Sequence, residues 1–363
     1  MARSTRLSPR SAGLVFALVT FSGGAASVVG LNAVGSGLEK AAFAQPSANI
    51  PNYTLVGQFA LPSEAWDVGP DGRILQIRGN DIWRQDAANG SAFSRIGSVP
   101  AGQISNFGAS FLSISGDGSR IALGDNNFNA SASVYVVGSA GLSTTADTAT
   151  TRIVCGNFDG TWDDNTLYVT GADAATFNSQ LYRVSFSAPG TPAVETVLRD
   201  IGLGSGGVAV RGGRLYTGTG YGSAAQPTGQ IRSFNIGSLG SPGSPLPAPF
   251  SAGTLETTAL SASPLGFDRA GNLLAGGGDN FGGTTDIGYA AVIDPANPDP
   301  AAWLRLSPGT TDTLYSAVFN SATDELLVVG GGTAYRYSIP GPAGAAVLTL
   351  GWVVAVSRKR AVR

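Results

Sequence analysis

The sequence predicts an all-β fold, and within that class a six-bladed β-propeller of four-stranded blades whose ring is closed by the N-terminal strand. Three observations predict it: the composition, a strand unit that recurs six times, and one spare strand ahead of the first unit. Charged residues make up only 13% of the chain, and 52 of its 363 residues are Gly. Such a composition is typical of many short strands joined by tight turns.

The second strand of the repeated unit is its most regular part. It is a short, mostly apolar run, found at residues 73–79, 120–124, 166–171, 214–218, 272–276 and 325–330. Each copy follows a turn such as Pro70-Asp71-Gly72 or Arg211-Gly212-Gly213. Asp, Asn and Gly tolerate the φ values of two-residue hairpin turns. A third, alternating strand follows each copy, so the sequence indicates six strand-rich units, the pattern of a propeller.

The two ends of the repeated region complement each other. The sixth unit runs from its third strand directly into the C-terminal tail and lacks a fourth strand, whereas residues 53–59 form a strand that belongs to no unit. Pairing this spare strand with the last unit would close the ring and remove an exposed sheet edge. We therefore expect the propeller to occupy residues 45–339.

Residues 1–44 have the pattern of an export signal. Arg3, Arg6 and Arg10 form a basic region, and residues 12–21 form an apolar one. The alternative is an uncleaved anchor over residues 12–34. Either interpretation requires the cell's export machinery as a partner.

Residues 340–363 form a distinct tail. Pro340, Gly341 and Pro342 open it, residues 343–357 are uncharged and mostly apolar, and the basic end at 358–363 contains Arg358, Lys359 and Arg360. The basic end is expected to stay cytoplasmic, which places the body outside the membrane.

This tail resembles the PEP-CTERM sorting signal of bacterial envelope proteins, with Gly341 at the position where that motif has Glu. The resemblance implies processing by an exosortase-type membrane protease, and a body in the cell envelope or outside the cell that is anchored at least transiently by the helix. A plain C-terminal anchor is the alternative.

The charge of the body excludes several classes of function. Residues 45–339 contain 23 acidic residues against 14 Arg and no Lys, a net charge of −9. An acidic body lacks the basic surface that nucleic acids require. The chain has no His and a single Cys, so Ser-His-Asp catalysis, Cys-His catalysis and an internal disulfide are excluded. No cofactor or metal motif is present, and none is predicted.

Two loops that follow second strands are the best candidates for ligand contact. They combine carboxylate and amide groups with an aromatic ring, which suits sugars. Their residues are Asp125, Asn126, Asn127 and Phe128 in the second unit, and Asp279, Asn280 and Phe281 in the fifth. Two alternatives remain: ligation of Ca²⁺ by the same oxygens, and ordinary turn chemistry.

The favoured function is therefore a non-catalytic binding or structural role at the cell surface, with a glycan or a surface protein as ligand. The alternative is a secreted hydrolase or lyase acting on polysaccharide or small esters. Asp67, Asp163 and Asp268 lie beside aromatic residues at first strands, where paired carboxylates would suit acid–base chemistry. Because Asp163 and Asp268 have the pattern of turn residues, no catalytic residue is assigned.

Overall fold

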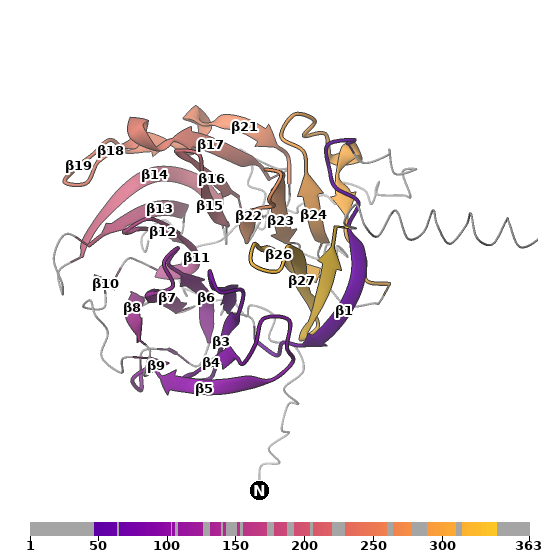
Figure 1. Ribbon diagram of the computed structural model, residues 1–363. Helices are drawn as coiled ribbons and strands as arrows, with labels where there is room; N and C mark the ends of the chain where they lie inside the picture. The colour runs from indigo at the N-terminus through magenta and orange to yellow at the C-terminus, as the bar shows by residue number, and fades with distance from the viewer. Residues whose placement is uncertain are drawn as a thin grey trace, which may run out of the picture. The chain divides into compact units, whose positions relative to one another are not determined.

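The structure is a computed structural model that describes residues 47–339. Its gaps lie at 64, 103, 106–107, 126–130, 139–140, 143–150, 153–154, 173–177, 187–191, 204–205, 220–228, 260–263, 278–288 and 310–313. The described part is an all-β propeller (Figure 1), with three short 3-10 helices, η1 (Ile236–Leu239), η2 (Phe250–Ala252) and η3 (Pro300–Ala302), as its helical elements. None of its helices is long and apolar enough to cross a bilayer. The export signal and the C-terminal tail lie outside the described residues.

The strands of the described residues form six sheets of four or five strands and one two-stranded ribbon, and the sheets are numbered in chain order. Sheet 1 contains β2 (Trp66–Val68), β3 (Ile74–Arg78), β4 (Asp81–Gln85) and β5 (Phe93–Ser98). Sheet 2 contains β6 (Ala109–Ile114), β7 (Arg120–Asp125), β8 (Ser131–Gly138) and β10 (Thr151–Arg152), with β9 (Gly141–Leu142) paired to β8. Sheet 3 contains β11 (Cys155–Asp163), β12 (Thr166–Ala172), β13 (Asn178–Ser185), β14 (Ala193–Leu203) and β20 (Ala248–Pro249).

The second half of the chain forms three further sheets. Sheet 4 contains β15 (Val208–Arg211), β16 (Arg214–Gly218), β17 (Ile231–Asn235) and β21 (Thr254–Thr257). Sheet 5 contains β22 (Leu265–Phe267), β23 (Leu273–Gly277), β24 (Tyr289–Ile293) and β25 (Leu304–Arg305). Sheet 6 contains β26 (Leu314–Asn320), β27 (Glu325–Gly330), β28 (Thr333–Ser338) and β1 (Thr54–Ala60). The ribbon is β18 (Gly240–Ser241) with β19 (Ser244–Pro245).

The hydrophobic core is divided among the spaces between neighbouring sheets. In β27, Leu326 and Val328 belong to the cluster shared with sheet 5, whereas Leu327 and Val329 belong to the cluster shared with sheet 1. Successive side chains of a strand point to opposite faces, so such a strand must be apolar at every position. This double burial explains why the second strands of the repeat have continuous apolar runs.

Six such clusters connect the sheets in cyclic order, from sheets 1 and 2 round to sheets 6 and 1. The innermost strands make contacts in the same order, which is β2, β6, β11, β15, β22, β26 and again β2. The described sheets thus surround a common centre, and each is stabilised by apolar contact with two neighbours.

The predicted hairpin turns are present between the first and second strands. Gly212 and Gly213, between β15 and β16, both have positive φ, of 56° and 71°, which is the conformation of a type I′ turn. Gly72 has φ 77°, and a Cβ there would lie 2.8 Å from the Cβ of Ala322 in the equivalent turn of sheet 6. Asn320, at the end of β26, joins the same two turns because its Nδ2 donates to the Gly72 carbonyl at 2.9 Å.

The predicted pairing of the spare strand with the last unit is confirmed. β1 pairs antiparallel with β28, so that Thr54 lies opposite Ser338. In Figure 1 the indigo β1 lies along the yellow strands from the other end of the chain. The segment before β1 is tied to sheet 5, since Tyr53 Oη donates to Asp268 Oδ2 at 3.0 Å and Asn49 Nδ2 donates to Asp294 Oδ2 at 2.9 Å.

A buried ion pair holds the two-stranded ribbon on sheet 3. Arg183 of β13 donates from Nε and Nη2 to Glu195 Oε2 at 3.0 and 2.7 Å, and from Nη1 and Nη2 to the carbonyls of Gly240 and Ser241 at 2.6 and 2.7 Å. The other oxygen of Glu195 accepts from the Gly243 amide at 2.6 Å. The Arg183 side chain is only 2% exposed, so these bonds lie almost out of water. Strand β18 and the turn after it are therefore both held by one side-chain pair.

Candidate functional site at the central channel

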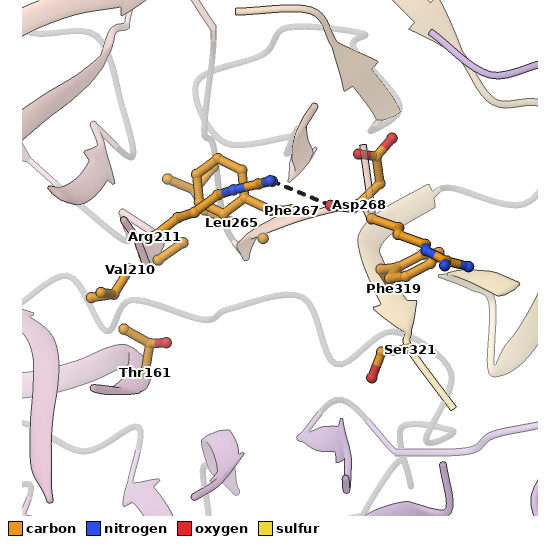
Figure 2. Close-up of a pocket in the computed structure, with 11 residues that line it drawn as sticks. Thr161, Val210, Arg211, Leu265, Phe267, Asp268, Phe319 and Ser321 are labelled. Atoms are coloured by element: carbon orange, nitrogen blue, oxygen red, sulfur yellow. Dashed lines mark hydrogen bonds between the residues drawn. The ribbon is translucent and has the colours of Figure 1, made fainter. Parts of the chain in front are cut away.

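A cavity of about 720 Å³ lies between the innermost strands. Its walls come from sheets 3, 4, 5 and 6, at the ends of the strands where the first hairpin turn begins (Figure 2). The lining residues are Thr161, Ala209, Val210, Arg211, Leu265, Gly266, Phe267, Asp268, Arg269, Phe319 and Ser321. Short side chains, such as Ala209 and Ser321, line the cavity next to a few large ones.

The large side chains of the cavity are two arginines and two phenylalanines. Arg211 packs against the Phe267 ring, with Cζ 5.3 Å from the ring centroid, and Nη1 donates to the Asp268 carbonyl at 3.3 Å. Tyr216 meets the Phe267 ring edge-on at 4.8 Å between centroids. The Phe267 ring is thus held between a cation and a second ring, and Arg211 is oriented across the cavity wall.

Asp268 is the single carboxylate among these lining residues, and its oxygens are fully used. Oδ1 accepts from the amides of Gly271 and Asn272 at 2.7 and 2.8 Å. Oδ2 accepts from Asn272 Nδ2 at 2.7 Å and from Tyr53 Oη at 3.0 Å. Asp268 therefore closes its own turn and fastens the N-terminal segment, as its sequence pattern indicates. Burial, together with the charge of Asp268, raises the pKa of Tyr53, which keeps the phenol a donor.

Two other carboxylates, Asp67 and Asp159, belong to innermost strands and repeat one arrangement. Asp67 Oδ1 accepts from the amide of the next residue, Val68, at 2.7 Å, and Oδ2 accepts from Ile114 in the adjacent sheet at 2.8 Å. Asp159 accepts in the same way from Gly160 at 2.9 Å and from Val208 in the adjacent sheet at 2.8 Å. An innermost strand is a sheet edge whose inward amides lack a ladder partner. These carboxylates supply that partner across the gap between sheets.

Burial shifts the pKa of both carboxyl groups. It raises the pKa of Asp159 to about 7 and that of Asp67 to about 6, although the backbone amides that donate to them act in the opposite direction. The charge of Asp67 raises the pKa of Asp159 further, so the two carboxylates interact across the interior. A carboxyl group that titrates near neutral pH is also a common feature of acid–base catalytic sites. The hydrogen bonds that Asp67 and Asp159 already accept decide between this catalytic role and the structural role described above.

The predicted site residues are only partly described. Asp125 ends β7, is buried, and accepts at Oδ1 from the amide and hydroxyl of Ser105 at 3.1 and 2.7 Å. Asn126, Asn127, Phe128, Asp279, Asn280 and Phe281 lie outside the described residues, as do Pro340, Gly341, Pro342, Arg358, Lys359 and Arg360. The glycan-binding loops and the sorting tail therefore stay predictions.

The candidate catalytic carboxylates are placed by the structure. Asp67 lies in strand β2, Asp268 lies in a turn and Asp163 is the last residue of β11, so they do not occupy equivalent positions. Sequence reasoning missed Asp159, Arg211 and Arg269. Asp159-Gly160 looks like a turn pair, and Arg211-Gly212-Gly213 was interpreted only as a turn. Within the described ranges, no three His, Cys, Asp or Glu residues gather as a metal site would require.

No protein family matches the chain, and no curated protein does. Among solved structures, a gluconolactonase from Xanthomonas campestris is similar with 12% identity and a TM-score of 0.50, over 82% of this chain and 97% of the other. The hydrazine synthase of Kuenenia stuttgartiensis has 11% identity and a TM-score of 0.48 over 74% of each chain. U3-55K has 15% identity and a TM-score of 0.48 over 82% and 83%. The first similarity extends to the propeller fold alone, and the other two are weaker.

Proposed function

We propose that the chain is an exported six-bladed propeller of the bacterial cell envelope that binds a glycan or a surface protein without transforming it. In this proposal the six sheets are six blades of one ring, and β1 is the strand that closes it. The observation that supports a binding role is the use of the interior carboxylates. Asp67, Asp159 and Asp268 each accept hydrogen bonds at both oxygens from backbone or side-chain donors.

A hydrolase of the two-carboxylate type would need a different arrangement. Glycoside hydrolysis requires two carboxyl groups that face one cavity across the bond to be cleaved, one of them able to give up a proton to the leaving group. Here the cavity wall carries guanidinium groups, aromatic rings and hydroxyls, and the one carboxylate among its described residues, Asp268, has both oxygens occupied by hydrogen bonds. Such a wall suits recognition of polar, partly apolar molecules better than proton transfer.

The alternative function, a secreted hydrolase or lyase, has one specific observation in its favour. The pKa of Asp159 near 7 would let this group exchange a proton at physiological pH. The group would first have to release the amides of Gly160 and Val208, and the neighbouring sheet would lose its acceptor.

Binding without turnover is the expected result for the purified full-length protein. We expect it to bind a subset of bacterial envelope polysaccharides on a glycan array, and to release neither reducing ends nor unsaturated uronides from the polysaccharides it binds. The Asp159→Asn variant, checked for an unchanged thermal unfolding transition, serves as the control. Turnover by the wild-type chain that this variant lacks would establish the enzyme instead.

The location at the envelope is supported by the sequence of the two ends. An N-terminal export signal and a tail that ends in Arg358, Lys359 and Arg360 fit a body outside the cytoplasmic membrane, held at least transiently by residues 343–357. Replacing these three basic residues with Gln is expected to move the protein from the membrane fraction or to block its sorting. Unchanged fractionation of this variant, compared with the wild type, would remove the basis for the sorting function.

A further inference from the structure

The described lining of the central cavity carries more positive than negative side chains, in contrast to the body as a whole. Arg211 and Arg269 both line it, and Asp268 is the single carboxylate among the described lining residues. The surrounding body carries a net charge of −9. The two arginines thus provide local positive charge in a body that is negative overall. This arrangement favours a small ligand with one negative charge over a polyanion, because the acidic body would repel the parts of a polyanion that extend outside the cavity.

The guanidinium group of Arg211 is available to such a ligand. Among the described residues its hydrogen bond uses Nη1, toward the Asp268 carbonyl, and no described carboxylate lies within ion-pair distance of it. Arg211 is exposed, yet the Phe267 ring 5.3 Å away limits its rotation. A planar guanidinium held on a ring is prepared to make two parallel hydrogen bonds to a carboxylate.

Arg269 adds a second cation at the cavity. It forms an ion pair with Asp324 at 3.5 Å, and its side chain is 76% exposed. An exposed pair of this kind contributes little to stability, so Arg269 can turn from Asp324 to a ligand at small cost. The two arginines come from sheets 4 and 5, so both of these sheets contribute a positive side chain to the cavity wall.

The remaining lining residues fit the body of a sugar ring. Figure 2 shows Thr161, Val210 and Ser321 around the open space, with Phe319 beside Asp268. Phe319 provides a flat apolar surface, and the hydroxyls of Thr161 and Ser321 can donate to or accept from sugar hydroxyls. A volume of about 720 Å³ is in the range of small-molecule sites and exceeds the needs of one ring.

We propose that this cavity binds a sugar that carries one carboxylate, as a free hexuronate or as the terminal uronate of a chain, with Arg211 on the carboxylate. The inference rests on the proposed function, since it assigns the ligand class and a site for it. None of the described lining residues belongs to the loops predicted at 125–128 and 279–281, so a test of one prediction does not depend on the other.

The test is calorimetric titration of the full-length protein with methyl glucuronide and methyl galacturonide, each compared with its neutral methyl glycoside. We expect one molecule of uronide bound per chain, with the neutral glycoside at least about tenfold weaker because a charge-assisted hydrogen bond is lost. Binding of the uronide is also expected to weaken as salt is added.

Three variants locate the contact. Arg211→Gln is expected to weaken uronide binding about tenfold or more and to leave neutral sugar binding unchanged, whereas Arg211→Lys should fall between this variant and the wild type. Arg73→Gln is the matched control, because Arg73 follows the equivalent turn of sheet 1, is paired with Asp71 at 3.3 Å and does not line the cavity. It should bind like the wild type.

The outcomes separate this inference from the proposed function. Equal affinity for acidic and neutral glycosides, or an Arg211→Gln variant that binds uronide normally, would refute the cavity site. If no uronide binds while a glycan array is positive, the cavity inference fails and the binding function stands. If the uronide is consumed rather than bound, the proposed non-catalytic function fails.

Discussion

Deleting residues 1–60 is expected to leave a chain that does not remain a folded monomer at 25 °C, whereas deleting residues 1–46 should leave stability unchanged. The longer deletion removes β1, exposes the edge of β28, and removes the buried side chains of Tyr53 and Phe59. Burial of each such side chain contributes about 2–3 kcal/mol, and a typical domain has a total stability of about 5–15 kcal/mol. Urea denaturation and size-exclusion chromatography of the two truncated proteins measure the difference.

A peptide supplied in trans makes this test specific. A synthetic peptide of residues 47–60 should restore the monomer to the longer deletion, because a free sheet edge accepts an added strand. The same peptide with Phe59→Ser should restore it less well. If both truncated proteins unfold at the same urea concentration, β1 contributes nothing to the closure of the ring.

Arg183→Met is expected to lower the free energy of unfolding by about 3–5 kcal/mol. The substitution leaves Glu195 buried beside the Gly243 amide without its cation, and it removes both donors to the carbonyls of Gly240 and Ser241. The first effect destabilises sheet 3, and the second releases the ribbon. Chemical denaturation gives the free energy, and limited proteolysis near Ser241–Ser244 reports the ribbon.

Two controls accompany this prediction. The double variant Arg183→Met, Glu195→Met should recover part of the loss, because an apolar pair has no unmatched charge. Arg95→Gln breaks an ion pair to Asp81 of 2.8 Å whose side chains are 52% and 40% exposed, and it should lower the free energy of unfolding far less than Arg183→Met does, because solvent screens an exposed pair. Equal effects of Arg95→Gln and Arg183→Met would show that burial does not determine the energy of these pairs.

Much of the fold could be predicted because the repeat carries its own local signals. Second strands such as 325–330 are apolar at consecutive positions, and each follows a turn whose residues accept positive φ, as Gly212, Gly213 and Asp324 do. The spare strand at 53–59 could be assigned by counting, since one strand was missing at the other end. Contacts that join distant segments were not predictable in this way, for example Arg183 with the ribbon.

The site was less predictable for a physical reason. Asp159 and Arg211 become notable only through partners in a neighbouring sheet, the Val208 amide and the Phe267 ring. Neither partner is near in sequence, and the local patterns Asp-Gly and Arg-Gly-Gly have an ordinary explanation as turns. Asp67 could be placed in a first strand and Asp268 in the turn after one from the sequence, but the hydrogen bonds that occupy their oxygens are visible only in the structure.

The pairing of Thr54 with Ser338 also has a consequence for the order of folding. A polypeptide is made from its N-terminus, so β1 emerges first and its partner β28 emerges last. Each sheet, including sheet 6, can begin from a hairpin between consecutive strands, which costs little loop-closure entropy, whereas the pairing of β1 with β28 must bring together residues from opposite ends of the body. The nascent body therefore carries its first strand without a partner until synthesis is almost complete, and docking of that strand is the step that ends assembly.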